Sequence, residues 1–165
     1  MTVTNVDKDA EALSLTITAE FEAPAERVWQ LWADPRQLER WWGPPDYPAT
    51  VVQHALEPGA AMRYYMTSPE GDRHHGWWNV LSVDPPRRVE FDEGFADAAG
   101  APDPDMPVTR MVLSVEDRPG GGTIMTVAST FSSVAAMEQL MAMGMDEGMT
   151  LAMGQIDDLL ADVII

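Results

Sequence analysis

The chain has 165 residues, of which 27 are acidic and 10 are basic, so its formal net charge is −17. Such a negative balance disfavours DNA, RNA and anionic membranes as partners, and the absence of cysteine from the sequence excludes disulfides and thiolate metal sites. A chain of this length is typical of one domain around one core. We therefore expect a single domain over residues 1–165 with no nucleic-acid partner.

The first twelve residues, MTVTNVDKDAEA, are polar and acidic. They do not contain the basic segment and apolar run of a secretory signal peptide. The uncharged stretch 119–137 is rich in Gly, Ser and Thr and alternates as a strand does, so it does not predict a membrane span. We expect a flexible N-terminus over residues 1–12, a cytoplasmic location and no integral membrane contact.

Residues 13–21, LSLTITAEF, alternate with a period of two and predict a strand that is buried on one face. Two short helices are predicted next, in FEAPAERVWQLWADPRQLERWWGP over 21–44. Pro24 and Asp34-Pro35 are typical helix starts, because proline presets the first helical φ and an Asp side chain accepts from free backbone N–H groups. Each helix carries apolar residues at helical spacing, so each is expected to bury one face.

Six further strands are predicted, in TVVQHAL, AMRYYMT, RHHGWWNVLSV, RRVEF, VTRMVLSVE and GTIMTVASTF, separated mainly by turns rich in Gly and Pro. The segment 92–107, DEGFADAAGAPDPDMP, follows the fourth of these and lacks a periodic pattern. Its length and composition predict a mobile loop that serves as a lid or rim. The sequence thus predicts seven antiparallel strands.

The chain is predicted to end in helix, over 134–143 and then in a long segment to about Val163. A helical wheel places the following apolar residues on one face: Met145, Met149, Ala152, Met153, Ile156, Leu159, Leu160 and Val163. Leu151 falls among the polar positions instead. Together with the outward Tyr65, it suggests a weak homodimer.

These elements predict an α+β fold, in which a curved seven-stranded antiparallel sheet wraps around a long C-terminal helix and two short helices follow the first strand. The pattern resembles the SRPBCC or START-like helix-grip superfamily, in the branch similar to activators of the ninety-kilodalton heat-shock protein ATPase. The resemblance covers residues 13–162. It depends on APAERVWQLWADPRQLERWWGP, the PG and PEGD turns, VDPPRRVEF, GGGT and GMTLAMGQIDDLLAD.

The resemblance implies an apolar cavity between the sheet and the last helix, and ligands such as lipids, sterols or polyketides. It carries over no cofactor and few catalytic residues. Where members of this family often have Gly-Trp at the start of the last helix, this chain has Gly148-Met149. The smaller side chain should enlarge or reshape the cavity.

Strand alternation divides inward from outward residues. We expect Met62, Tyr64 and Met66 to face inward, and likewise His75, Trp77, Asn79 and Leu81 on the next strand. The predicted cavity wall comprises Trp42, Met62, Tyr64, Met66, His75, Trp77, Asn79, Phe91, Met111, Met125, Ser129, Met145, Met149 and Met153. A wall rich in methionine adapts to irregular apolar ligands, although methionine also fills gaps in ordinary cores.

The sequence offers two candidates for proton transfer, His75 and Glu93. An imidazole titrates near neutral pH, and a carboxylate at the rim of an apolar cavity would gain a raised pKa. Structural roles as a satisfied polar group and a loop residue are the alternatives. His74 and His75 are adjacent on a strand and should face opposite ways, so no metal site is predicted. Motifs for nucleophilic catalysis or phosphate binding are absent from the sequence.

The first functional hypothesis is a non-enzymatic module that binds a small apolar molecule, with His75, Asn79 and Ser129 as polar anchors. An alternative is an enzyme of the cyclase, aromatase or hydrolase type that uses the same pocket, with His75 or Glu93 moving a proton. A second alternative, implied by the resemblance alone, is an interaction domain associated with a chaperone. It ranks lowest, because the chain has no room for the additional domain of eukaryotic activators.

Overall fold

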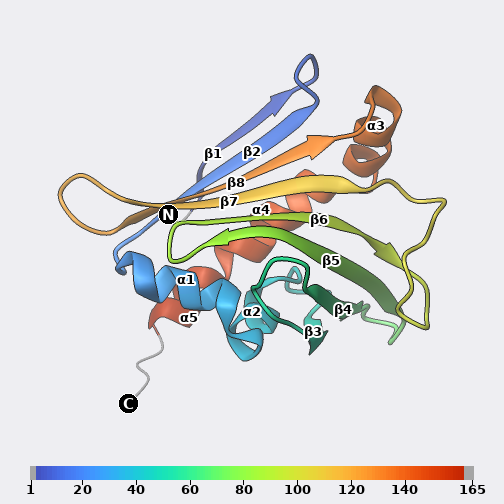
Figure 1. Cartoon of the computed structure of the whole chain (residues 1–165), viewed down its shortest axis with the longest axis horizontal. Helices are drawn as coiled ribbons and strands as arrows, with labels where there is room; N and C mark the ends of the chain where they lie inside the picture. Colours follow the sequence, from blue (N-terminus) through green and yellow to red (C-terminus); the bar gives the residue numbers. More distant parts are fainter. Residues whose placement is uncertain (1–2, 162–165) are drawn as a thin grey trace.

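The computed structural model describes residues 3–161 as one eight-stranded antiparallel sheet and five helices (Figure 1). The strands are β1 (Val3–Asp9), β2 (Ser14–Phe21), β3 (Ala49–Gln53), β4 (Ala61–Thr67), β5 (Arg73–Asp84), β6 (Arg88–Ala96), β7 (Thr109–Asp117) and β8 (Thr123–Phe131). The helices are α1 (Ala25–Ala33), α2 (Pro35–Trp41), α3 (Val134–Ala142), α4 (Met145–Gly154) and α5 (Ile156–Ala161). The spatial order is β1-β2-β8-β7-β6-β5-β4-β3. This confirms the predicted α+β helix-grip fold.

The sheet has one strand more than the seven predicted, because β1 pairs antiparallel with β2 at the sheet edge. Residues 3–9 are therefore not the flexible segment that we expected. Most side chains of β1 are exposed, so backbone pairing holds the strand and no apolar alternation marks it in the sequence. Lys8 also donates to Asp146 at the start of α4, at 2.8 Å, which ties this edge strand to the C-terminal helices.

Helices α1 and α2 form the predicted pair and meet at Asp34. Its carboxylate accepts from the backbone N–H of Arg36 at 2.9 Å and from the side chain of Gln37 at 3.0 Å. These bonds satisfy free donors at the start of α2 and fix the bend between the helices. The apolar faces of both helices are buried against the sheet.

The tryptophans of the helix pair join an aromatic cluster in the interior. Trp78 of β5 stacks on Phe91 of β6 at 4.1 Å between ring centroids, and Trp42 meets Trp78 edge-on at 4.9 Å. Trp32 and Trp41 add a further edge contact at 4.8 Å. Each of these rings is at most 6% exposed. The cluster closes the space between the helix pair and the middle of the sheet.

Strand β6 is longer than predicted. Its pairing with β5 continues to Ala96, so residues 92–96 belong to the sheet and not to the loop predicted over 92–107. The alternation of Val89, Phe91, Glu93 and Phe95 carries the strand pattern through this segment, and the charged residues in it obscured that pattern. The connection to β7 therefore begins at Asp97.

The C-terminal helix is present but divided. Helix α4 ends at Gly154, and Gln155 interrupts the helix before α5 begins. Gln155 Nε2 donates to the carbonyl oxygen of Gly43 at 2.6 Å, which anchors the interruption to the chain that follows α2. The predicted end near Val163 lies outside the described residues. No helix within residues 3–161 is long and apolar enough to cross a membrane.

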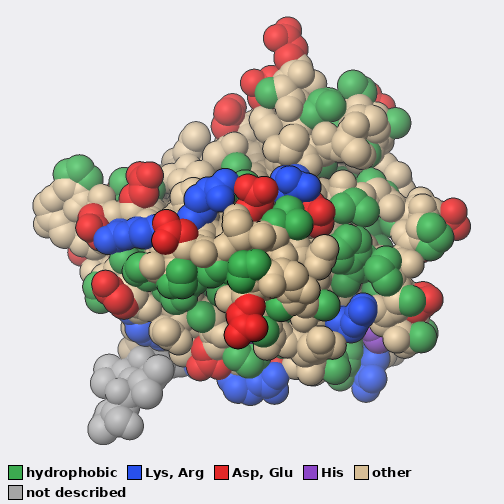
Figure 2. Space-filling view, in the orientation of Figure 1, with side chains coloured by type: hydrophobic (Ala, Val, Ile, Leu, Met, Phe, Trp, Pro, Cys, Tyr) green, Lys and Arg blue, Asp and Glu red, His purple; other side chains and the backbone are tan. Residues whose placement is uncertain are grey.

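The outer face of the sheet, opposite the helices, carries a ladder of ion pairs on β6 and β7. Arg110 binds Asp92 at 2.6 Å and Glu90 at 3.3 Å, and Arg88 binds Glu90 at 2.8 Å. Figure 2 shows basic and acidic side chains alternating in a row across this face. Their charges keep this face hydrated, so the apolar site lies on the other side.

Candidate functional site

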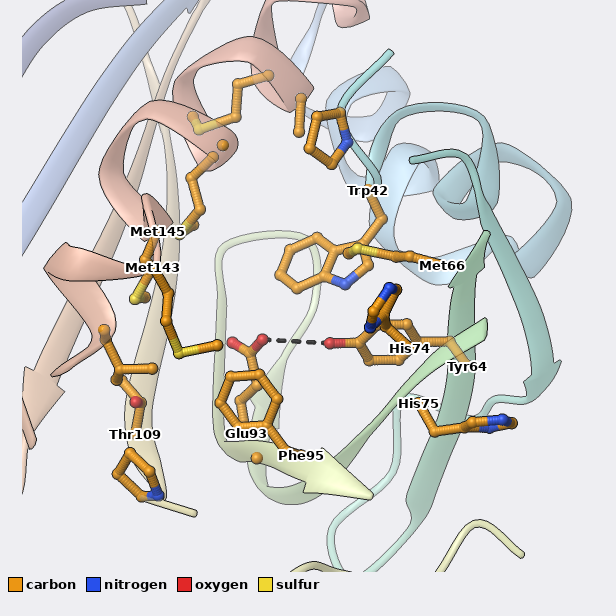
Figure 3. A pocket seen from close by; sticks show the side chains of 18 of the residues that line it. Trp42, Tyr64, Met66, His74, His75, Glu93, Phe95, Thr109, Met143 and Met145 are labelled. Atoms are coloured by element: carbon orange, nitrogen blue, oxygen red, sulfur yellow. Dashed lines mark hydrogen bonds between the residues drawn. The ribbon is translucent and has the colours of Figure 1, made fainter. Parts of the chain in front are cut away.

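A cavity of about 250 Å³ lies on the inner face of the sheet, between the ends of β4 to β7 and helices α3 and α4 (Figure 3). Most of its wall is apolar. The lining residues are Trp41, Trp42, Pro44, Tyr64, Met66, His74, His75, Glu93, Gly94, Phe95, Pro107, Thr109, Leu140, Met143, Met145, Gly148, Met149, Ala152 and Met153. The position between sheet and α4 is the one that the resemblance implied.

The predicted wall residues fall into three groups. Those that line the cavity are Trp42, Tyr64, Met66, His75, Met145, Met149 and Met153. Those that lie outside its lining and are buried are Met62, Phe91, Met111, Met125 and Ser129. Those that point to the outer face are Trp77 and Asn79. Phe91 belongs to the aromatic cluster, and Met62, Met111 and Met125 are part of the same closely packed core, so the space that the prediction had left open is filled.

The predicted face of β5 is wrong. Gly76, Trp78 and Val80 are buried, whereas Asn79 is exposed. Residues paired directly across strands share a face, and Tyr64 of β4 pairs with Gly76. An inward Tyr64 therefore requires an inward Gly76, which turns His75, Trp77, Asn79 and Leu81 away from the interior.

Trp77 shows why a tryptophan can lie on the outer face here. Its indole covers Gly94 of β6, where an added Cβ would approach the ring to 2.6 Å. Its Nε1 donates to the carbonyl oxygen of Phe95 at 3.0 Å. The glycine supplies a flat seat for the ring, and the hydrogen bond satisfies the indole N–H. Trp77 thus packs on the outer face of the sheet and does not line the cavity.

Glu93 of β6 brings a carboxyl group into the apolar cavity. The Tyr64 hydroxyl donates to Glu93 Oε1 at 3.3 Å. Glu93 Oε2 is buried and has no hydrogen-bond partner among the described residues. Burial raises the pKa of Glu93 to about 7, and the bond from Tyr64 opposes this only partly. Near neutral pH the group is therefore present in both protonation states.

Tyr64 links Glu93 to the aromatic cluster. Burial, and then the charge of Glu93, hold the pKa of Tyr64 well above its usual value, so its hydroxyl stays protonated. The ring meets Trp42 edge-on at 6.1 Å. Trp42 Nε1 is buried and has no hydrogen-bond partner within residues 3–161. The rigid aromatic neighbours fix the direction of the Tyr64 hydroxyl toward Glu93.

The histidines contribute less than expected. His75 borders the cavity, but its side chain points away from it (Figure 3) and lies 5.6 Å from the Tyr65 ring, between centroids. His74 is exposed at the cavity mouth. The described residues include no group of three or more His, Asp or Glu side chains that could hold a metal ion. Of the two proton-transfer candidates, only Glu93 directs its polar atoms into the cavity.

Sequence reasoning missed several wall residues. Phe95 and Thr109 share the inward face with Glu93. Phe95 lies beyond the predicted end of its strand, whereas Thr109 lies within the predicted strand 108–116 and has the same parity as the inward Met111. Met143 lies between α3 and α4 and reaches the cavity although it is 56% exposed. The alternation of β6 could have identified Phe95. The position of Met143 depends on the angle between two helices, which no local pattern encodes.

Known proteins resemble this chain closely in sequence and structure. The family model described as "Activator of Hsp90 ATPase homolog 1-like protein" matches residues 22–161. A crystal structure of a Mycobacterium smegmatis protein is 46% identical, with a TM-score of 0.90 and coverage of 99% of each chain. A solution structure of an Arthrobacter aurescens protein is 48% identical, with a TM-score of 0.93, covering 98% of this chain and 94% of that one.

A more distant solution structure, from Staphylococcus epidermidis, is 26% identical, with a TM-score of 0.83 over 98% of this chain and 96% of that one. The search among curated proteins found no match. The structural agreement with the three solved proteins extends over nearly the whole chain, including the sheet and the helices that enclose the cavity.

Proposed function

We propose a function from one established premise, that the chain belongs to the Activator of Hsp90 ATPase homolog 1-like family. The proposal is that the protein binds a small hydrophobic molecule, such as a lipid, sterol or polyketide, in the cavity between the sheet and α4. The single observation that carries it is the cavity of about 250 Å³ with a wall of mostly apolar side chains. Burial of an apolar molecule there would release water from that wall.

The composition of the wall supports the proposal. Met66, Met143, Met145, Met149 and Met153 surround the cavity from β4, α4 and the α3–α4 turn. Methionine side chains are flexible and polarizable, so they adapt to ligands of irregular shape. Trp42, Tyr64 and Phe95 add flat aromatic surfaces. Such a wall suits a compact apolar molecule rather than a sugar or a nucleotide.

Native mass spectrometry of protein purified without added ligand tests this function. We expect a retained mass that is released on unfolding and that partitions into organic solvent. The matched variant is Met149→Trp, which should reduce the retained fraction by filling the cavity. Retention of an equal amount by this variant would place the molecule elsewhere and would contradict the proposal.

A second candidate function, acid-base catalysis on the bound molecule, is favoured by one observation. Glu93 Oε2 is buried without a partner, and the raised pKa of Glu93 lets it hold or release a proton near neutral pH. The test compares the molecules retained by the unmodified protein and by Glu93→Gln. A different mass in the variant would indicate turnover, and the same mass in both would support binding alone.

A further inference from the structure

We propose that the pocket selects a neutral apolar molecule with one carbonyl-type oxygen, and that Glu93 Oε2 donates its carboxyl proton to that oxygen. This inference depends on the proposed function, because it concerns the ligand of the same cavity. It adds the chemical class of the ligand and the protonation state in which the protein binds it.

The direction of the hydrogen bonds places the donor. Tyr64 stays protonated, so its hydroxyl donates to Glu93 Oε1. The proton of a neutral Glu93 then lies on Oε2, the oxygen that has no partner among the described residues. Figure 3 shows the Glu93 side chain pointing into the cavity, toward Met143 and away from the strand. A buried O–H without an acceptor is costly, and a ligand oxygen would remove that cost.

The surroundings of Glu93 favour its neutral form when a ligand is bound. Its cavity includes neither Lys nor Arg among the lining residues, and the other titratable groups there are Tyr64, His74 and His75. Tyr64 is neutral, His74 is exposed, and His75 points away. A ligand that displaces water from the cavity would further reduce the solvation of a carboxylate charge. Binding should therefore be coupled to uptake of a proton.

The hydrogen-bonding capacity of the cavity decides among ligand groups. An ammonium group carries three donors and would lose its hydration in a wall made mostly of apolar side chains. A ligand carboxylate would face Glu93 and bring a second negative charge into the same site. A carbonyl oxygen needs one donor, which Glu93 Oε2 provides. The neutral acceptor thus matches the site at the lowest desolvation cost.

The test uses three probes with one ring system: 2-acetylnaphthalene, 2-ethylnaphthalene and 1-(2-naphthyl)ethylammonium. Equilibrium dialysis measures each Kd at pH 6 and pH 8.5. At pH 6 we expect the ketone to bind about 2- to 10-fold more tightly than the hydrocarbon, as one hydrogen bond allows. With a pKa of about 7 for Glu93, the neutral fraction falls about 30-fold between the two pH values, so most of the hydrogen bond is lost at pH 8.5. The ketone Kd should therefore rise toward that of the hydrocarbon, by about the 2- to 10-fold that the bond contributes.

Two variants identify the group responsible. Glu93→Gln keeps a donor without titrating, so the ketone preference should persist and its pH dependence should disappear. Ketone binding that keeps its pH dependence in this variant would overturn the assignment of that dependence to Glu93. Glu93→Leu should bind the ketone and the hydrocarbon equally. Thermal unfolding of both variants checks that they fold. If Glu93→Leu does not fold, the loss of pH dependence in Glu93→Gln alone tests the role of Glu93.

Equal binding of ketone and hydrocarbon by the unmodified protein at pH 6 would overturn the inference and leave the proposed function standing. Tightest binding of the ammonium probe, or tighter ketone binding at pH 8.5, would also overturn it. Failure of all three probes to bind would count against the proposed function itself. The experiment therefore distinguishes a cavity that binds no apolar molecule from one that binds it without a hydrogen bond from Glu93.

Discussion

Gly76 of β5 lies directly against the ring of Tyr64 on β4, so closely that a Cβ added to Gly76 would come within 2.4 Å of the Tyr64 hydroxyl oxygen. The two residues pair across the strands and share the inner face. Tyr64 can reach Glu93 because the facing position carries no side chain. The glycine therefore sets the geometry of the polar pair in the cavity.

Gly76→Ala should destabilise the fold by about 1 to 3 kcal/mol, because the new methyl group forces Tyr64 to move. Urea unfolding of the variant and of the unmodified protein gives the difference in their free energies of unfolding. In a Tyr64→Leu background, where the ring is absent, the same substitution should cost little. Gly154→Ala is the matched control, since nothing lies within 4 Å of a Cβ there. Equal costs of Gly76→Ala in both backgrounds would contradict this account.

Glu93 should make stability depend on pH. Its pKa rises from 4.5 to about 7 on folding, so between these values the folded state holds a proton that the unfolded state has released. The contribution of Glu93 to the free energy of unfolding is fully present below pH 4.5. It falls by a total of about 3 kcal/mol as the pH rises through about 7. Glu93→Gln should therefore be the more stable protein at pH 8, but not at pH 5.

Urea unfolding of both proteins at several pH values gives this difference directly. The many other acidic residues repel one another less at low pH, and subtraction of the two curves removes that shared background. A difference that does not change between pH 5 and pH 8 would show that Glu93 is not desolvated in the folded protein.

Met149→Trp should be tolerated, because Met149 of α4 lines a cavity that can take the larger ring. We expect thermal stability to hold or rise and binding of a fluorescent apolar probe to weaken. Met149→Leu, which nearly conserves volume, is the control and should leave binding close to normal. A Met149→Trp protein that loses about 1 to 3 kcal/mol with unchanged probe binding would refute the cavity as a binding site.

The segment from Asp97 to Pro107 is expected to act as the rim of the cavity, and Pro107 is part of the cavity wall. Hydrogen exchange should be slow at residues 92–96, which are paired in β6, and faster beyond them. Asp97 accepts from the backbone N–H groups of Ala99 and Ala101, so Asp97→Ala should speed exchange in this turn alone. Strand-like protection of 97–107, unchanged by 2-acetylnaphthalene, would argue against a mobile rim.

Leu151 of α4 is 57% exposed and is not covered by α3, so the proposed weak dimer remains the prediction for this residue. Tyr65 contributes less apolar surface than expected, because the Arg73 guanidinium lies 4.4 Å above its ring. Small-angle scattering over a concentration series should show a rising particle mass. Leu151→Glu should abolish the rise. A particle that stays monomeric at the highest concentration would end this proposal.

Local patterns predicted the fold well where burial and periodicity agree. The helix pair follows from its prolines, Asp34 and its apolar spacing, and the inner faces of β4, β7 and β8 follow from alternation. The face of β5 could not be assigned this way, because tryptophans occupy both of its faces. Trp78 packs in the core, while Trp77 covers Gly94. The deciding facts are cross-strand contacts with Tyr64 and Gly94.

The site was predicted only in part for a related reason. Sequence places Met149 and Tyr64 on faces that point inward, but it does not tell which inward space is filled. Rings of Trp78 and Phe91 stack and occupy the middle of the sheet, so the inward Met111 belongs to the core. The open volume begins only past the cluster, near Glu93. Packing between distant segments determines that boundary.

The interruption at Gln155 separates α4, which lines the cavity, from α5, which packs in the core. Before it, α4 supplies Met145 and Met149 to the cavity wall, while after it Ile156 and Leu159 are buried in the core. The side chain of Gln155 donates to the carbonyl oxygen of Gly43. This bond fixes the start of α5 independently of the side chains that α4 directs into the cavity. Substitutions at Met145 or Met149 should therefore reshape the cavity wall without displacing α5 from the core.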